Sequence, residues 1–177
     1  MLEPGVSSMK SHPGITANPV EVPTGEVKAS SQGALQASAI GSCVVVAACD
    51  PKARIGGLAH VMLPGRAPQG QPQGKTRYAL DAIEALVLAM TALGAEERRL
   101  EICLIGGANV LMKDDDAICE TNIRSVTKVL EERGLNVLST ELGGTTRRGA
   151  SMDVDKGTVS CTVGDSPRRV IWKAEMP

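Results

Sequence analysis

The chain has 177 residues, a net charge of −1 and 42% apolar residues, which are ordinary values for one globular domain. It contains one Tyr, one Trp and no Phe, so its core must be built from aliphatic side chains and methionine. Because it also lacks a basic block large enough to neutralise many phosphates, the composition argues against a nucleic-acid partner.

Cysteine usage and hydropathy indicate the compartment. The five cysteines, at positions 43, 49, 103, 119 and 161, form an odd set without a CxxC pair. Nothing resembles a signal peptide, and no stretch approaches the ~20 apolar residues of a membrane span. We therefore expect a cytoplasmic protein with free thiols. Zinc-ligand spacing is missing, and the acidic run Asp114–Asp116 fits a solvated turn better than a calcium loop, so no metal or cofactor is expected.

The N-terminal 24 residues contain four prolines and show no clear periodicity. We expect residues 1–24 to form a flexible arm and residues 25–177 to form a single domain. The domain is expected to begin with a short strand near Gly25, in the segment GEVKAS.

Two apolar runs follow in the first half of the chain. The run CVVVAACD ends at the turn signal Asp50-Pro51, which predicts a buried strand over residues 43–48. A second apolar run, residues 53–64, is predicted to pair with it as a hairpin. Residues 65–75 are polar and rich in Gly, Pro and Gln, so we expect a mobile loop that could act as a lid or a partner contact.

The second half of the chain alternates helices and strands. Apolar residues at helical spacing predict a helix over residues 76–94 and a second amphipathic helix over 119–134, each closed by a glycine. Between them, EICLIGGANVL at 101–111 is predicted to be a buried strand that runs into a Gly-Gly turn. Three short segments within 135–164 are expected to form an antiparallel meander. This order favours an α+β domain in which mixed and antiparallel sheets form a sandwich flanked by two main helices.

Cys43 and His60 are the one Cys-His pair that the predicted hairpin brings together. His60 lies 17 residues after Cys43, and the other histidine, His12, falls in the expected arm. A hairpin that turns between the two residues places them within cross-strand distance. A neighbouring imidazole is the usual means by which a catalytic thiol becomes a thiolate.

The pattern alone leaves two interpretations of this pair open. A cysteine before three valines is often a small core residue, and a histidine between Ala59 and Val61 is often a buried, hydrogen-bonded imidazole. The remaining cysteines have no comparable partner and are interpreted as core or surface thiols.

Several motifs in the same order resemble the chemoreceptor glutamine deamidases, the CheD proteins of bacterial and archaeal chemotaxis. The motif GSCV is followed after 17 residues by the histidine of AHVMLP. Further matching segments lie at 25–26, 76–95, 105–111, 121–123 and 141–159, so the resemblance covers roughly residues 25–160.

The resemblance implies an α+β cysteine hydrolase that converts glutamine side chains on the cytoplasmic helices of methyl-accepting chemotaxis receptors into glutamate. It also implies docking of a CheC-type phosphatase as a second partner. Cys43 would be the nucleophile and His60 the general base and acid. The Gly41-Ser42 turn would offer backbone N–H groups to hold the oxyanion.

The family orients its histidine with a threonine a few residues before the cysteine, and no Thr occupies residues 36–40 here. Ser38 is the nearest hydroxyl and is the candidate third catalytic residue. If Ser38 points away, a backbone carbonyl could orient His60 instead.

Two further functions remain as alternatives. One is a CheD-like binding module that regulates a CheC-type phosphatase with weak or no catalysis, and the other is a cysteine hydrolase of the same fold with another amide or ester substrate. The presence of both Cys43 and His60 argues against the binding module, because a pure binder needs neither.

Overall fold

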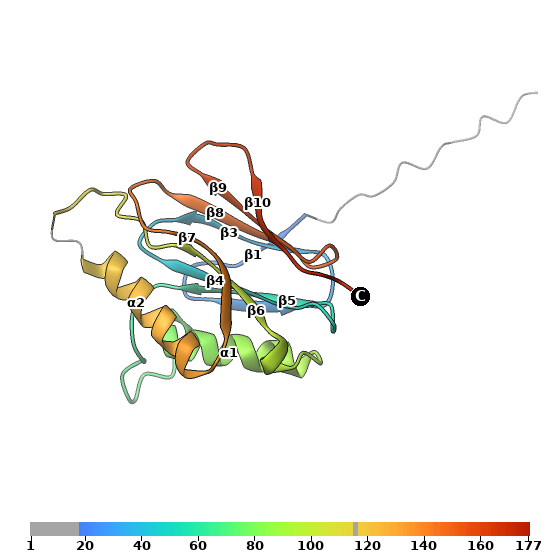
Figure 1. Cartoon of the computed structure of the whole chain (residues 1–177). Helices are drawn as coiled ribbons and strands as arrows, with labels where there is room; N and C mark the ends of the chain where they lie inside the picture. The colour runs from blue at the N-terminus through green and yellow to red at the C-terminus, as the bar shows by residue number, and fades with distance from the viewer. Residues whose placement is uncertain (1–17, 115–116) are drawn as a thin grey trace, which may run out of the picture.

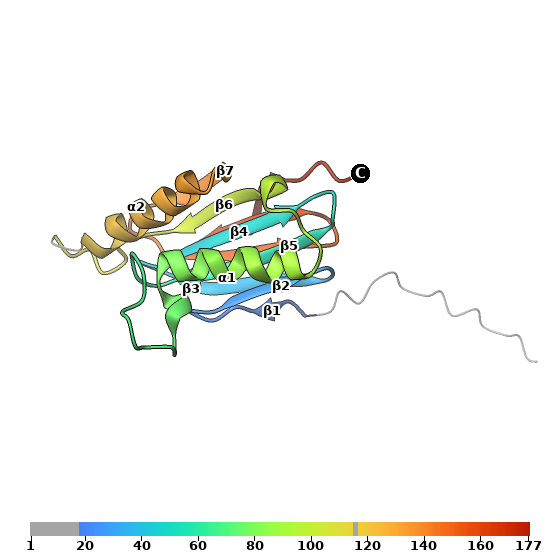
Figure 2. The same ribbon diagram turned by 90° about the horizontal axis from the view of Figure 1, so that it is seen from below.

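The computed structural model describes residues 18–114 and 117–177, which form two packed β-sheets and one layer of helices (Figure 1). The first sheet has the order β1-β3-β8-β9-β10, and the second has the order β2-β5-β4-β6-β7. The two α-helices lie over the outer face of the second sheet (Figure 2). The predicted α+β sandwich with two flanking helices is therefore confirmed.

The strands and helices have the following bounds: β1 Val20–Glu21, β2 Val27–Ser30, β3 Ala34–Ile40, β4 Val44–Asp50, β5 Ile55–Val61, α1 Ala79–Ala92, β6 Glu101–Gly106, α2 Ala117–Glu132, β7 Asn136–Leu142, β8 Arg148–Asp153, β9 Thr158–Val163 and β10 Arg169–Lys173.

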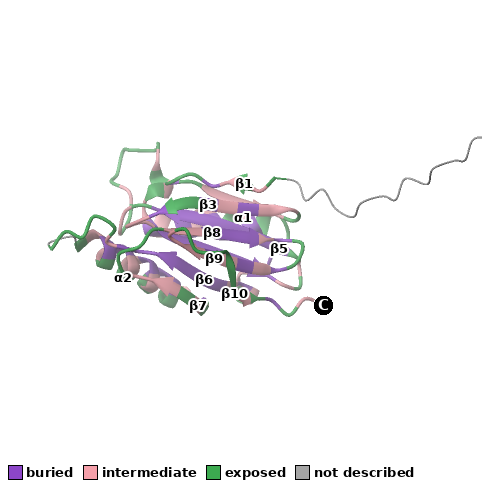
Figure 3. Ribbon diagram, turned by 90° about the horizontal axis from the view of Figure 1, so that it is seen from above, coloured by how far each residue is buried: buried purple, intermediate pink, exposed green. Residues whose placement is uncertain are grey.

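Strand β4 is the centre of the molecule, because both of its faces are covered. Its alternate residues Val44, Val46 and Ala48 pack toward the helices, whereas Val45 and Ala47 pack toward the first sheet. All seven residues of β4 are buried, and burial colouring shows the interior strands covered and the loops at the ends exposed (Figure 3). Covering on both faces explains why the sequence here is an unbroken apolar run rather than an alternating one.

The predicted β4–β5 hairpin is confirmed, and its register places His60 opposite Val45, two residues from Cys43. The two strands pair antiparallel from Asp50↔Ile55 to Val44↔Val61. Both predicted helices are confirmed as well. Helix α1 packs its buried face against β5 and α2, using residues at the predicted spacing: Ala82, Ile83, Leu86, Val87 and Met90.

The predicted C-terminal meander is only partly correct. Strands β8, β9 and β10 do pair antiparallel in sequence order within the first sheet. Strand β7, which the prediction placed beside them, instead pairs parallel with β6 in the second sheet. Helix α2 connects β6 to β7, so this part of the chain is a β-α-β crossover. The long apolar face of α2 requires that crossover, because it must be buried on the second sheet.

The N-terminal part of the chain enters the fold before residue 25. Val20 and Glu21 pair parallel with β3, and Val22 is fully buried in the core between the sheets. The expected arm therefore contributes residues 20–24 to the packed structure. Residues 1–17 lie outside the described part of the chain, as do two residues of the acidic run predicted to be a solvated turn, Asp115 and Asp116.

The loop at residues 65–75 is fastened to both helices. The backbone N–H of Gly65 donates to the Ser125 hydroxyl at 2.8 Å, and that of Ala67 donates to the Asp81 carboxylate at 2.8 Å. Neither helix within residues 18–114 and 117–177 is long and apolar enough to cross a lipid bilayer.

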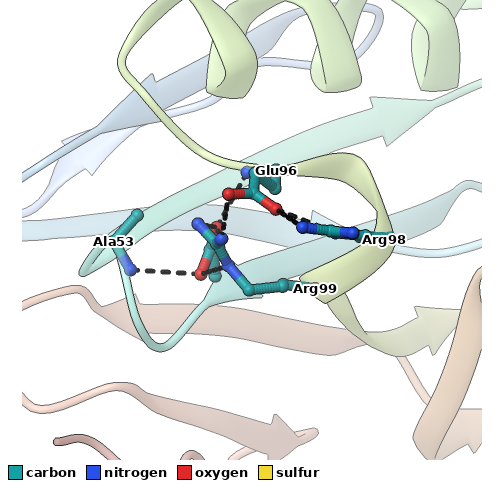
Figure 4. Close-up of polar contacts among 5 residues, drawn as sticks. Ala53, Glu96, Arg98 and Arg99 are labelled. Atoms are coloured by element: carbon teal, nitrogen blue, oxygen red, sulfur yellow. Dashed lines mark hydrogen bonds and ion pairs between the residues drawn. The ribbon is translucent and has the colours of Figure 1, made fainter.

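The C-terminal end of β4 is fixed by a buried carboxylate. Asp50 is fully buried and accepts hydrogen bonds from the Arg99 guanidinium, at 2.8–3.1 Å, and from the backbone N–H groups of Ala53 and Glu96, at 3.1 and 2.8 Å. Glu96 also pairs with Arg98 and Arg99 (Figure 4). Burial alone would raise the pKa of Asp50, but these hydrogen bonds outweigh it and lower the pKa. This carboxylate therefore stays ionised with every oxygen satisfied.

Candidate active site

Cys43 and His60 lie on the same face of the second sheet, at the opposite end of β4 from Asp50. His60 pairs directly with Val45, and side chains alternate along a strand, so Cys43 and Val45 share a face. The thiol and the imidazole are therefore diagonal neighbours on the face that packs against the first sheet. Side chains at this separation still interact.

The imidazole of His60 is buried and has one free nitrogen. His60 is 2% exposed, and its Nδ1 lies 3.1 Å from the carbonyl oxygen of Val22. Because a carbonyl only accepts, Nδ1 carries the proton and Nε2 carries the lone pair. Within the described residues, Nε2 has no hydrogen-bond partner. Burial lowers the pKa of His60, against the raising effects of the Val22 carbonyl and the Glu21 carboxylate. His60 is thus a neutral base with an available nitrogen.

Cys43 is the one cysteine that the described structure leaves partly exposed. Burial raises the pKa of the Cys43 thiol, whereas hydrogen bonds from the Thr24 side chain and from the backbone N–H of Cys43 itself lower it. The other four cysteines are buried, and burial raises the pKa of Cys49 and Cys103 to about 12. Cys43 therefore combines partial access with two hydrogen-bond donors beside its sulfur, which are conditions that a reactive thiol needs.

The backbone around Cys43 is held by the two residues that follow β6. The N–H of Gly107 donates to the carbonyl of Cys43 at 2.7 Å, and the N–H of Ala108 donates to the carbonyl of Gly41 at 2.8 Å. A Cβ atom at Gly106 would collide with the Cys43 carbonyl, and both glycines have positive φ, at 124° and 63°. This Gly-Gly pair therefore allows a close approach to the backbone of Cys43 that a side chain at Gly106 would block.

The segment Val22–Glu26 completes the surroundings of the pair. Besides the Val22 carbonyl and the Thr24 hydroxyl, it contributes two backbone hydrogen bonds to His60, from Gly25 N–H at 2.8 Å and to the Glu26 carbonyl at 3.0 Å. A short stretch between β1 and β2 therefore contacts both the imidazole and the thiol. The sequence carried no signal for the contacts of Val22 and Thr24, because these residues fall in the expected arm, whereas Gly25 and Glu26 begin the expected domain.

Ser38 is not hydrogen-bonded to His60 in this structure. It lies on the exposed side of β3, and its hydroxyl and backbone N–H contact the Glu21 carboxylate at 3.2 and 2.9 Å. A bulge between Ala37 and Ile40, with Ala39 at φ 52°, turns this part of the strand outward. The atom that orients His60 here is the Val22 carbonyl oxygen.

Gly41 and Ser42 form the half-buried bend that leads into Cys43. Within the part of the chain that the structure describes, neither of their N–H groups donates a hydrogen bond. The carbonyl of Ser42 is held at 3.0 Å by the side chain of Asn122, a residue that the sequence analysis did not assign to the site. A polar residue on the apolar face of α2 was the signal that could have found it.

Comparison with known proteins assigns the family. A family model described as CheD chemotactic sensory transduction matches residues 62–163, which is more than half of the chain. The chain belongs to the CheD family.

Curated CheD proteins match it over most of their length. A probable chemoreceptor glutamine deamidase CheD of Chlorobium luteolum is 45% identical over 150 residues, covering 84% of this chain and 75% of the relative. The chemoreceptor glutamine deamidase CheD of Thermotoga maritima is 34% identical, covering 71% and 78%. A probable CheD deamidase of Archaeoglobus fulgidus is 35% identical, covering 68% and 77%.

Proposed function

We propose that this protein is a chemoreceptor glutamine deamidase that uses Cys43 as its nucleophile. Its membership of the CheD family, among relatives named for that activity, carries this proposal. The active-site geometry supports it, because a half-buried thiol and a neutral imidazole with a free Nε2 share one face of the β4–β5 hairpin.

In the first half of the reaction, Nε2 of His60 takes the proton from the Cys43 thiol as the sulfur attacks the glutamine carboxamide carbon. A C–S bond forms, and the electron pair of the carbonyl moves onto its oxygen. When this tetrahedral intermediate collapses, the imidazolium returns its proton to the nitrogen. Ammonia leaves, and a γ-glutamyl thioester remains on Cys43.

In the second half, His60 removes a proton from a water molecule that attacks the thioester carbon. The C–S bond breaks, glutamate is released, and the thiol regains its proton. Neutral His60 suits both steps, because a base must be unprotonated before each attack. The lowered pKa of His60 keeps it so at neutral pH.

Three groups assist this pair in the proposal. The Val22 carbonyl fixes the tautomer of His60, which is the role of the third member in a catalytic triad. The Thr24 hydroxyl donates to the sulfur and stabilises the thiolate. The N–H groups at Gly41, Ser42 and Cys43 are the candidate donors to the oxyanion.

The proposed substrates are glutamine side chains on the cytoplasmic helices of methyl-accepting chemotaxis receptors. A CheC-type phosphatase is a proposed second partner, and the proposed compartment is the cytoplasm, where those receptor helices lie. The names of the curated relatives support the receptor as substrate.

The decisive experiment follows the mass of a receptor cytoplasmic fragment incubated with the protein. Each conversion of glutamine to glutamate adds about one dalton, and Cys43→Ala should abolish the gain. Cys49→Ala is the matched control, because Cys49 lies on the same strand but is buried at its other end. Conversion by Cys43→Ala would disprove the nucleophile, and no conversion by the wild type on any receptor would disprove the function.

A further inference from the structure

Asn122 is a fully buried amide that bridges the two strand ends of the active site. It lies on α2, and its Nδ2 donates to the carbonyl of Ser42 at 3.0 Å and to the carbonyl of Met62 at 3.0 Å. Ser42 immediately precedes Cys43, and Met62 lies two residues after His60. One side chain thus connects the strand end that carries the thiol to the strand end that follows the imidazole.

Packing alone does not explain this asparagine. Its Oδ1 is buried and has no hydrogen-bond partner within the described residues. The residues one and two turns on along the buried face, Val126 and Val129, are apolar. A buried acceptor left without a partner is destabilising, so an apolar residue would suit this position better unless the two donors were needed.

One of these two hydrogen bonds, to the Ser42 carbonyl, fixes the orientation of the peptide bond before Cys43. In a trans peptide the C=O of one residue and the N–H of the next point in opposite directions. Because Asn122 holds the Ser42 carbonyl toward α2, the N–H of Cys43 points away from α2. That N–H lies against the Cys43 sulfur and, within the described residues, donates to no backbone carbonyl.

The next peptide unit is also held, since the Gly107 N–H donates to the Cys43 carbonyl at 2.7 Å, so the Cys43 backbone is fastened on both sides of its Cα. A backbone donor beside the nucleophilic sulfur, without a competing acceptor, is where an oxyanion forms when that sulfur adds to a carbonyl group.

We propose that Asn122 is a positioning residue that aims the Cys43 N–H at the oxyanion formed when the thiol adds to a carbonyl carbon. This inference rests on the proposed function in taking Cys43 as the nucleophile. In the addition step the sulfur bonds to carbon, the carbonyl electron pair moves to oxygen, and the Cys43 N–H donates to that oxygen. Asn122 itself touches neither the sulfur nor the substrate.

The test compares two reactions of Cys43 that differ in the need for an oxyanion. Acylation by p-nitrophenyl acetate passes through a tetrahedral oxyanion and releases one nitrophenolate per enzyme as a burst. Alkylation by iodoacetamide displaces iodide and forms no oxyanion. In Asn122→Ala the burst rate should fall at least about tenfold, while the alkylation rate of Cys43 should stay within about twofold of wild type.

Val126→Ala is the matched control, because Val126 is also fully buried on α2 but makes no hydrogen bond to either carbonyl. It should keep both rates within about twofold of wild type. Asn122→Ser retains one donor and leaves a smaller void, and it replaces Asn122→Ala if that variant does not fold. The burst rate of Asn122→Ser should lie between the burst rates of Asn122→Ala and Val126→Ala.

Two results would overturn the inference. One is a normal burst rate in a folded Asn122 variant, and the other is an equal fall in burst and alkylation rates, which would mean that Asn122 only places the thiol. Neither reaction requires a receptor. A wild type that shows a Cys43-dependent burst but converts no receptor glutamine would therefore disprove the proposed function. The inference about Asn122 would still be decided by the burst and alkylation rates alone.

Discussion

The two ends of β4 differ in how completely their polar groups are hydrogen-bonded. At the C-terminal end, Asp50 has all of its oxygens paired, and its pKa is lowered. At the N-terminal end, His60 keeps an unpartnered Nε2, Asn122 keeps an unpartnered Oδ1, and the pKa of the Cys43 thiol is raised.

This difference separates a structural polar cluster from the cluster that we propose to be catalytic. Full satisfaction stabilises the charged form of Asp50 and gives it nothing further to bind. Incomplete satisfaction leaves Nε2 of His60 able to accept a proton, whereas burial favours the protonated form of the Cys43 thiol, so that thiol needs a base to remove its proton. The fully paired Asp50 and the incompletely paired groups around Cys43 therefore lie at opposite ends of one seven-residue strand.

The largest expected effect on stability belongs to the Asp50 end. Asp50→Asn should lower the free energy of unfolding by about 3 kcal/mol, because Arg99 and two backbone donors lose their buried carboxylate. A domain of this size should then melt about 10 °C lower, as measured by calorimetry. Turnover at a temperature where the variant is folded should be unchanged.

The loss of stability in Asp50→Asn should become smaller as the pH falls. The pKa of Asp50 in the folded protein lies below its ordinary value of 3.8. The stability that ionised Asp50 contributes is therefore complete above pH 3.8 and is lost as the pH falls through the folded pKa. The gap between wild type and Asp50→Asn should narrow below about pH 4. Asp153→Asn, a partly exposed carboxylate paired with Lys156, is the control and should cost far less. A difference in stability between wild type and Asp50→Asn that persists below about pH 4 would contradict a stabilising role for the ionised Asp50 carboxylate.

A smaller effect, on reactivity rather than stability, is expected from Thr24. Thr24→Val removes the hydroxyl that lowers the pKa of the Cys43 thiol, so that pKa should rise further above its ordinary value. At neutral pH the thiolate fraction, and with it the alkylation rate by iodoacetamide, should fall about tenfold. The measurement is the pH dependence of alkylation at Cys43, followed by peptide mass.

Thr24→Ser keeps the hydroxyl and should restore the wild-type pH profile. An unchanged profile in Thr24→Val would remove this residue from the site.

The smallest effect is expected from Ser38→Ala. Because its hydroxyl contacts Glu21 on the exposed side of β3, the variant should keep kcat/KM within about twofold and stability within about 0.5 kcal/mol. Receptor deamidation and thermal melting measure the two quantities. A tenfold loss of kcat at unchanged KM would instead place Ser38 in contact with the catalytic histidine during turnover.

Local patterns in the sequence were sufficient to predict much of the fold. The Asp50-Pro51 turn predicted the β4–β5 hairpin, and helical spacing predicted α1 and α2. Strand β10 was missed because it is short and largely exposed, and β3 because a bulge interrupts it. The placement of β7 depended on which sheet α2 covers. That is decided by tertiary packing, and the local sequence pattern does not indicate it.

The predictability of the site follows the same division. Cys43 and His60 could be paired because a hairpin joins them within a short stretch of chain. The Val22 carbonyl could not be identified, because a backbone atom has no side-chain signature and lies 38 residues from the histidine it contacts. Asn122 could have been noticed, because a polar residue interrupts the apolar face of an amphipathic helix.

The two-residue strand β1 has a mechanical consequence for the chemistry. It anchors the start of the packed chain to β3, and the next residue presents the carbonyl that sets the tautomer of His60. Tension applied from the N-terminal side is therefore borne by the same short segment that holds the catalytic base. Peeling β1 from its sheet would pull on the Val22 carbonyl that contacts Nδ1 of His60, so the strength of this small anchor bounds what can be fused or tethered at that end.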